Sequence, residues 1–139
     1  MKAEYTFIAC VKTKRNIACK AKELYISPLF KMAYQYALKN TVSEDHIYIL
    51  SAKYGLIHNS DMIAPYEKTL NSENVKERKI WSYRVLQEMQ RRGISQNAHI
   101  MLLGGVNYRS FLEMILKNSY CPIRGLSMGK TLQWYKKHL

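Results

Sequence analysis

The sequence predicts an α/β protein of three layers, in which a mostly parallel sheet of about four strands carries helices on both faces. Short apolar runs rich in β-branched and aromatic residues alternate with longer segments of helical periodicity, an order typical of parallel sheets. Hydrophobic residues make up 47% of the chain, which is enough for a folded core. No linker or low-complexity segment interrupts the 139 residues, so a single domain over residues 1–139 is expected.

Four apolar runs are expected to form the strands. Residues 5–10, 47–50 and 98–103 each place aliphatic, aromatic or β-branched residues in succession between polar segments. A shorter run at residues 119–123 is the fourth strand. The run 47–50 is predicted to lie centrally in the sheet, because it is short, apolar and bounded by polar residues on both sides.

The first helix is expected to begin at Pro28 and to stop near Asn40. Ser27 is expected to be its N-cap, and proline is favoured at the first helical position because no N–H donor is needed there. One face of this helix carries apolar side chains at helical spacing, which we interpret as core: Leu29, Met32, Ala33, Tyr36 and Ala37.

Three further helices are predicted, each with a polar residue as its N-cap. The first of them is capped by Asn71 or Ser72 and ends at Gly93. The second is capped by Asn107 and ends at Leu116. The third is capped by Ser127 and spans residues 129–137. Residues 56–71, which contain Pro65, are expected to be an irregular connection that could cover the edge of the sheet.

Charge points to the class of partner. The chain has 22 lysines and arginines against 10 aspartates and glutamates, which gives a formal net charge of +12. Such a field attracts polyanions, and nucleic acid is the commonest of them. A nucleic acid or a nucleotide is therefore the expected partner, although a basic surface also suits an acidic protein.

Other compositional features favour a cytoplasmic protein without a metal. No segment approaches the roughly 20 consecutive apolar residues of a membrane helix, so no membrane partner is expected. Cys10, Cys19 and Cys121 form no Cys-x-x-Cys pair, so we expect reduced thiols and neither a disulfide scaffold nor a zinc site. No cluster has ligand spacing, and no metal or cofactor is expected.

Polar residues follow each predicted strand, and parallel strand ends meet at one edge of a sheet, so these residues are expected to converge on one anion-binding pocket. Contacts to phosphate or nucleic acid are expected from Lys12, Lys14, Ser51, Gly104, Gly105, Arg109, Ser127 and Lys130. The candidate catalytic residues are Lys53, Glu67 and Cys10. The candidates for stacking on a base or lining the pocket are Tyr54, Tyr66 and Tyr108.

Two motifs near the C-terminus do not fit their usual functions. Gly-x-Ser-x-Gly around Ser127 matches a hydrolase nucleophile turn, but no acidic residue follows it in the chain. Gly-Lys-Thr from Gly129 matches the end of a phosphate loop, but Arg124 stands where that loop needs its first glycine. Ser127 at a helix start still favours an anion site.

The central segment resembles the peroxide-stress protein YaaA family. The motifs that carry the resemblance are Leu50-Ser51-x-x-Tyr54-Gly55-Leu56 and Asp61-x-Ile63-x-Pro65-Tyr66. The flanking segments are similar to short bacterial and phage domains related to that family, through Cys10-x-Lys12-x-Lys14, Glu23-Leu24-Tyr25-x-Ser27-Pro28-Leu29-Phe30 and Gly129-Lys130-x-Leu132-Gln133-Trp134. The resemblance implies a DNA-binding intracellular protein of the stress response, and a fold related to base-processing enzymes of the uracil-DNA glycosylase type.

Three functions remain open at this point. The first is a nucleic-acid- or nucleotide-binding protein whose cations neutralise phosphates while tyrosines stack on a base. The second is an enzyme acting on a nucleobase or an N-glycosidic or ribosyl group, with Lys53 or Cys10 as nucleophile and Glu67 as acid or base. The third is a phage-type protein that binds an acidic host partner. Ser51 to Gly55 could also be an ordinary strand exit whose serine and glycine only make the turn.

Overall fold

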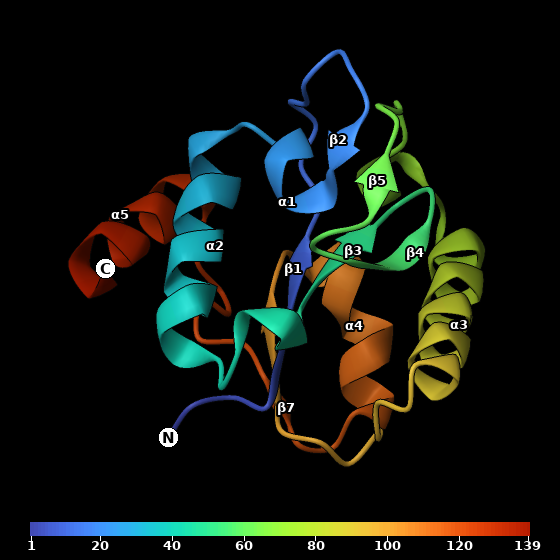
Figure 1. The fold of residues 1–139 in the computed structure, drawn as a ribbon. Coiled ribbons are helices and arrows are strands. Elements are labelled where there is room, and N and C mark those ends of the chain that lie inside the picture. The colour runs from blue at the N-terminus through green and yellow to red at the C-terminus, as the bar shows by residue number, and fades with distance from the viewer.

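The computed structural model describes residues 1–139 and contains a five-stranded, mostly parallel sheet in the order β4-β3-β1-β6-β7 (Figure 1). The strands are β1 (Tyr5–Ala9), β3 (Ile47–Ser51), β4 (Gly55–His58), β6 (Ile100–Leu103) and β7 (Ser119–Tyr120). β1 pairs in parallel with both β3 and β6, and β7 extends the parallel set beyond β6. The mixed α/β class and the mostly parallel sheet are confirmed, and each predicted apolar run contains a strand.

Strand β4 was not predicted, because its residues were expected to be irregular. It pairs antiparallel with β3, and Ser51 faces Gly55 at the end of the pair. Gly55 has a φ of 78°, which side-chain-bearing residues rarely adopt, and this allows the chain to reverse after Ala52–Tyr54. Two further short strands, β2 (Cys19–Lys20) and β5 (Met62–Ile63), form a separate antiparallel pair.

The helices are α1 (Ala21–Leu24), α2 (Pro28–Asn40), α3 (Val75–Arg91), α4 (Val106–Ile115) and α5 (Met128–His138). Two single turns, η1 (Glu44–His46) and η2 (Leu70–Ser72), complete the chain. None of the helices is long and apolar enough to cross a membrane.

The predicted N-caps of two helices are confirmed and those of two others are wrong. The hydroxyl of Ser27 accepts from Phe30 N–H, and that of Ser127 accepts from Lys130 N–H. Asn74 caps α3 in place of Asn71 or Ser72, because these two residues belong to the η2 turn. Gly105 occupies the cap position of α4 without a side-chain bond, so the predicted cap Asn107 lies inside the first turn.

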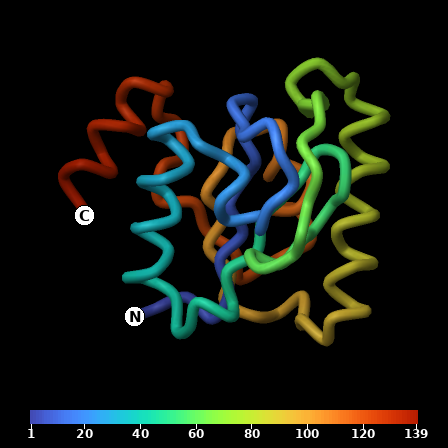
Figure 2. The backbone as a smooth tube through the Cα atoms, turned by 45° about the horizontal axis from the view of Figure 1, so that its top comes forward, coloured from blue at the N-terminus to red at the C-terminus, as the bar shows by residue number.

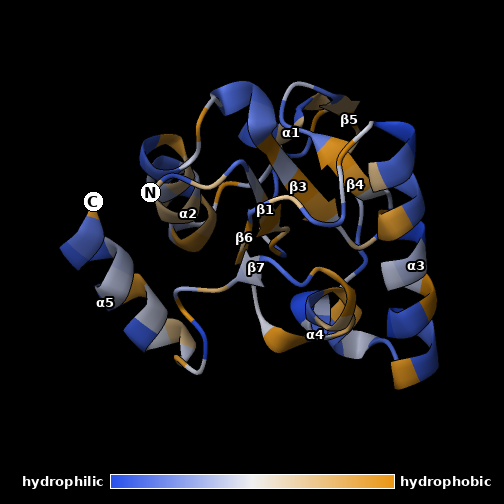
Figure 3. Cartoon of the chain, turned by 90° about the horizontal axis from the view of Figure 1, so that it is seen from below, coloured by the Kyte–Doolittle hydropathy of each residue, from blue (hydrophilic) through white to orange (hydrophobic).

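The helices pack in two pairs. α2 contacts α5 and β1, whereas α3 contacts α4 and β4. Figures 1 and 2 show α2 and α5 together at the left of the molecule and α3 at the right, with the strands between them. In Figure 3 β3 and β4 are largely hydrophobic, whereas α3 and α5 alternate between hydrophobic and hydrophilic residues. All four residues of β6 are buried, as is usual for a central strand of a parallel sheet.

The strand order places a change of direction between β1 and β6. From β1 the chain passes through α2 to β3 on one side, and from β4 it returns through α3 to β6 on the other side of β1. The loops that follow the neighbouring strands β1 and β6 therefore lead away from each other. Such a switch point at the carboxyl ends of the strands is where open α/β sheets commonly bind ligands.

Candidate functional site

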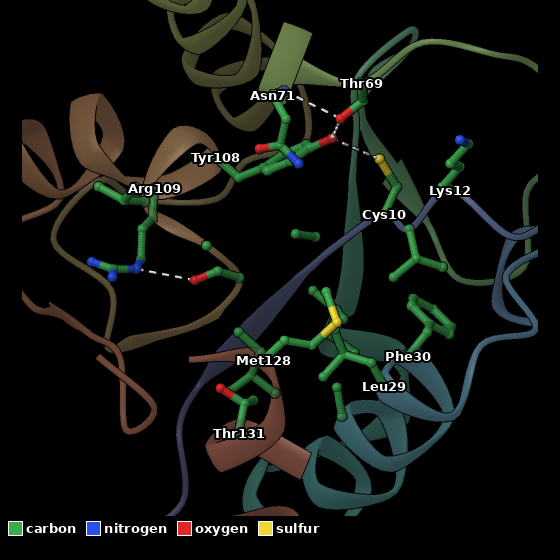
Figure 4. A pocket seen from close by; sticks show the side chains of 18 of the residues that line it. Cys10, Lys12, Leu29, Phe30, Thr69, Asn71, Tyr108, Arg109, Met128 and Thr131 are labelled. Atoms are coloured by element: carbon green, nitrogen blue, oxygen red, sulfur yellow. Dashed lines mark hydrogen bonds between the residues drawn. The ribbon is translucent and has the colours of Figure 1, made fainter. Parts of the chain in front are cut away.

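A cavity of about 1240 Å³ lies at this switch point. Its walls come from the exits of β1 and β6, the loop between β5 and α3, and the first turns of α2, α4 and α5 (Figure 4). The volume is somewhat above the roughly 300–1,000 Å³ of ordinary ligand pockets. The fold thus brings residues from distant parts of the sequence around one space.

Many of the residues predicted to form the site line this cavity: Cys10, Lys12, Lys14, Tyr66, Glu67, Gly104, Gly105, Tyr108, Arg109 and Ser127. Four other candidates do not line it: Ser51, Lys53, Tyr54 and Lys130. The expected convergence therefore occurs between the exits of β1 and β6 and the start of α5, and it does not include the exit of β3.

Ser51 is buried in the packed end of the β3–β4 hairpin. Its hydroxyl donates to the Tyr66 hydroxyl at 2.8 Å and accepts from Tyr54 N–H at 3.0 Å. The indole N–H of Trp81 donates to the Ser51 carbonyl at 2.8 Å. These partners use the polar atoms of Ser51, so its side chain is not available to a phosphate.

Lys53 and Tyr54 form the turn of the same hairpin. The Lys53 carbonyl accepts from the Arg84 guanidinium at 2.7 Å, and the Lys53 ammonium lies 5.2 Å from the centre of the Tyr54 ring. Because β4 turns back along β3, this turn lies outside the cavity wall. Lys130, in the first turn of α5, is exposed and also lies off the cavity lining.

Tyr108 joins the exit of β1 to the loop before α3. Its hydroxyl accepts from Leu70 N–H at 3.3 Å and lies 3.4 Å from both Cys10 Sγ and Thr69 Oγ1 (Figure 4). Its ring meets Trp81 edge to face, and burial, with a further contribution from Cys10, raises the pKa of Tyr108 well above its usual value. Tyr108 is therefore a neutral hydrogen-bonding group of the wall rather than an open stacking platform.

Tyr66 is anchored in a second buried network. Its hydroxyl bonds to Ser51 and, at 2.7 Å, to Tyr25, and burial raises the pKa of Tyr66 above its usual value. The ammonium of Lys14 lies 4.5 Å from the centre of the Tyr66 ring. Burial lowers the pKa of Lys14, while Cys10 and Glu67 act in the opposite direction. Tyr66 thus holds the covering loop in place, with Lys14 against its ring.

Arg109 is a buried cation, with 8% of its surface exposed. Its Nε–H donates to the Gly104 carbonyl at 3.0 Å and its Nη1 to Glu113 Oε1 at 2.8 Å, and Arg124 pairs with the other oxygen of Glu113. These bonds hold the guanidinium against the start of α4, and in Figure 4 its end points away from the middle of the cavity.

The start of α4 leaves backbone donors at the cavity. Gly105 and Val106 line the space, and no side chain caps this helix. A Cβ added to Gly105 would meet no atom within 4 Å, whereas one added to Gly104 would lie 2.7 Å from Ala9 Cβ. Gly104 therefore allows β1 and β6 to pack closely, and Gly105 leaves the approach to the helix amides open.

The cavity is also electrostatically positive. Its lining includes the cations Lys12, Lys14, Lys68 and Arg109 against the single carboxylate of Glu67. None of the three lysines makes an ion pair. An anionic ligand would be attracted to this space and would meet unpaired cations there.

A family model described as a family of unknown function (DUF6884) matches residues 6–137. The chain belongs to this family. The matched span includes every residue that lines the cavity, from Ile8 to Tyr135. No curated protein and no solved structure matches the chain.

In this DUF6884 protein the sequence reasoning missed part of the cavity wall. Leu29 was interpreted as core and Asn71 as a helix cap, while Thr69, Lys68 and Met128 were not named as site residues, yet all five line the space. Lys68 and Thr69 belong to the segment with Pro65, which was expected to cover the site, and this expectation could have identified them. No group of three or more His, Cys, Asp and Glu side chains could hold a metal ion.

Proposed function

We propose that the cavity binds a nucleotide, either free or within a nucleic acid, through its phosphate group. The observation that carries the proposal is the position of the cavity at the β1–β6 switch point, with four lining cations and one carboxylate. Parallel strands end there and helices begin there. The strand ends leave room for a ligand, and the helix starts supply positive dipole ends.

The phosphate is assigned to the start of α4. The N–H groups of Gly105 and Val106 have no capping side chain, and the buried Arg109 lies one turn further along the helix. Backbone amides at a helix start bind phosphate, and the positive charge of Arg109 nearby adds to the attraction for an anion. Lys12, at the opposite rim, adds an exposed positive charge (Figure 4).

The base is assigned to the apolar side of the cavity. Leu29 and Met128, from the first turns of α2 and α5, lie together on the side opposite Asn71 and Tyr108 (Figure 4). Met128 is largely exposed, so covering it with a planar ring would bury apolar surface. The polar side offers the Asn71 amide and the Thr69 hydroxyl to ring or sugar oxygens and nitrogens.

We further infer a three-layer domain related to the YaaA family, in which α2 with α5 and α3 with α4 cover opposite faces of the sheet. The contacts of α2 with β1 and of α3 with β4 support this arrangement. The motifs around Leu50–Leu56 and Asp61–Tyr66 support the kinship. DNA binding and a connection with the stress response follow from that resemblance and are part of the proposal.

A second candidate function is an enzyme acting on the nucleobase or ribosyl group. It is favoured by one observation: Cys10 and Glu67, two of the three predicted catalytic residues, line the same cavity. The third, Lys53, lies in the hairpin turn outside it, so this version of the proposal does not use Lys53.

The test is a calorimetric titration with nucleoside 5′-monophosphates and with inorganic phosphate. Val106→Pro removes one amide donor at the first helical position, where proline is tolerated, and Gly105 already has the extended conformation that proline requires before it. We expect about tenfold weaker phosphate binding, since a hydrogen bond to a charged group contributes about 1.5–3 kcal/mol. Affinity should also fall steeply with salt.

Two controls make the result specific. Val106→Ala keeps the amide, and Val75→Pro makes the same change at the first position of α3, away from the cavity. Both should bind as the wild type does. Equal weakening by Val75→Pro, or no binding of any nucleotide by the wild type, would contradict the proposal.

A further inference from the structure

The helix pair α2 and α5 carries positive charge and no acidic side chain. The two helices contact each other through Tyr36, whose ring centre lies 5.0 Å from that of Trp134 and 5.9 Å from that of Tyr135 (Figures 1 and 2). Neither helix contains an aspartate or a glutamate. Together they expose five lysines, which we call the α2–α5 lysine surface: Lys31, Lys39, Lys130, Lys136 and Lys137.

The charge of this surface is not neutralised within the protein. None of the five lysines makes an ion pair. The one carboxylate bonded to either helix is Glu44, which accepts from the Tyr34 hydroxyl and is already paired with Lys22. By contrast, α3 carries Glu77 and Glu88 among its cations. A patch of one sign attracts a polyanion more strongly than such a mixed surface does.

The α2–α5 lysine surface begins at the cavity. Leu29 and Met128, near the starts of α2 and α5, line the cavity, and Lys31 and Lys130 follow them two positions later in the same helices. Met128 is 70% exposed, so the cavity wall at α5 continues into the outer surface of the molecule. A ligand longer than one nucleotide would therefore pass from the cavity onto these lysines.

The spacing of the α5 lysines suits a row of phosphates. Lys130 and Lys137 are seven positions apart, which places them on one face of the helix and roughly 10 Å apart along its axis. Successive phosphates of one strand are about 3.4 Å apart along a B-form axis. The two lysines can therefore neutralise different phosphates of the same strand.

We propose that the α2–α5 lysine surface binds the backbone of a single-stranded nucleic acid, one nucleotide of which occupies the cavity. This inference deepens the proposed function and rests on it for the nucleotide in the cavity. A base that enters the cavity has to be unpaired, so a single strand is favoured over a duplex. The phosphates next to that nucleotide lie over the start of α5, and the following ones run along the helix towards Lys137.

The experiment is fluorescence anisotropy of a fluorescein-labelled oligothymidylate of about twelve nucleotides, measured over a range of salt concentrations. Lys136→Gln with Lys137→Gln removes two charges that lie off the cavity lining. We expect roughly tenfold weaker binding at low salt. The logarithmic salt slope should become about 1.4 less steep, since each single-strand phosphate contact contributes about 0.7. Lys136→Arg with Lys137→Arg should bind as the wild type does.

Lys76→Gln with Lys79→Gln is the matched control. It removes two exposed lysines from α3, neither of which makes an ion pair. The net charge falls by the same two units, so an effect of overall charge alone would be equal in the two variants. We expect the α3 variant to keep the wild-type salt slope. Both variants should bind nucleoside monophosphates as the wild type does, because none of the four lysines lines the cavity.

The outcomes separate this inference from the proposed function. Equal weakening by the α3 and α5 variants overturns the α2–α5 lysine surface, even if nucleoside monophosphates bind. Weakening by the α5 variant alone, in a protein that binds no nucleoside monophosphate, supports the surface and contradicts the nucleotide in the cavity. A duplex of oligothymidylate with oligoadenylate that binds as tightly contradicts the single strand. Polyglutamate that binds as tightly indicates a surface for an acidic protein and contradicts the nucleic acid.

Discussion

Two strand exits of this sheet carry similar residues and have different roles. After β3, Ser51, Lys53 and Tyr54 close a hairpin in which the Ser51 hydroxyl and carbonyl bond to Tyr66, Tyr54 and Trp81. After β1, Cys10 and Lys12 open onto a cavity of about 1240 Å³. Both exits present a small polar side chain followed by a lysine, yet only one of them meets a space that a ligand can enter.

The difference comes from the next strand in each case. β3 is followed by an antiparallel neighbour that folds back onto it, and the polar atoms of Ser51 at its end bond to the hairpin turn, to Tyr66 and to Trp81. β1 lies between β3 and β6, whose connections run in opposite directions, and its end opens onto the cavity that the loop from Tyr66 to Thr69 also lines. Polar residues at a strand end thus indicate a site only when the topology leaves that end open.

The largest effect is expected from a substitution that disturbs the close contact between Gly104 and β1 at the open strand end. Gly104→Ala would place a Cβ 2.7 Å from Ala9 Cβ, which is fixed to the backbone of β1. We expect the free energy of unfolding to fall by about 2–3 kcal/mol because two paired strands must separate. Denaturant titration measures it.

Gly129→Ala is the matched control for this substitution. Its Cβ would meet no atom within 4 Å, and it lies in the first turn of α5. It should be neutral or stabilising by up to about 1 kcal/mol, because alanine favours helix over glycine. Equal losses from the two substitutions would show that Gly104 is not required by the strand contact.

A smaller effect is expected at the closed exit. Ser51→Ala removes a buried hydroxyl that bonds to Tyr66 and Tyr54, and we expect a loss of about 1–2 kcal/mol of stability. Phosphate affinity, measured by the same titration as for Val106→Pro, should stay unchanged. A variant that folded normally but lost phosphate binding would place Ser51 in the site and remove the distinction between the two exits.

The smallest effect concerns a tyrosine of the cavity wall. Burial raises the pKa of Tyr135 above that of an exposed tyrosine. Such a group favours the folded state fully below pH 10, where the unfolded chain titrates, and this contribution is lost as the pH rises through the folded pKa. Tyr135→Phe should therefore match the wild type within about 0.5 kcal/mol at pH 7 and lose less stability above pH 10.

Tyr66→Phe is the comparison for this tyrosine. It lacks the hydroxyl that bonds to Ser51 and Tyr25, so it should already be destabilised at pH 7. Chemical denaturation of both variants at pH 7 and above pH 10 measures how the free energy of unfolding of each depends on pH. A Tyr135→Phe protein as unstable as Tyr66→Phe at pH 7 would show an unrecognised bond to the Tyr135 hydroxyl.

Local sequence signals were sufficient for most of the elements. Each of the four apolar runs contains a strand, and Ser27 and Ser127 cap the helices they were expected to cap. The wrong caps, Asn71 and Asn107, arose where several polar residues compete and only the path of the backbone decides which one lies at the helix end. β4 was missed because its own sequence shows no strand periodicity. It is a strand because it pairs with β3.

The amino-acid sequence was sufficient to predict the α/β class, the positive charge and the set of residues from which a site could be built. The tertiary structure decided the order of the strands, and through it which strand ends remain open. Cys10 and Arg109 lie 99 positions apart in the chain and line one cavity, whereas Ser51 and Lys53 face a packed hairpin. Strand order depends on contacts between distant segments, which composition, spacing and periodicity do not encode individually.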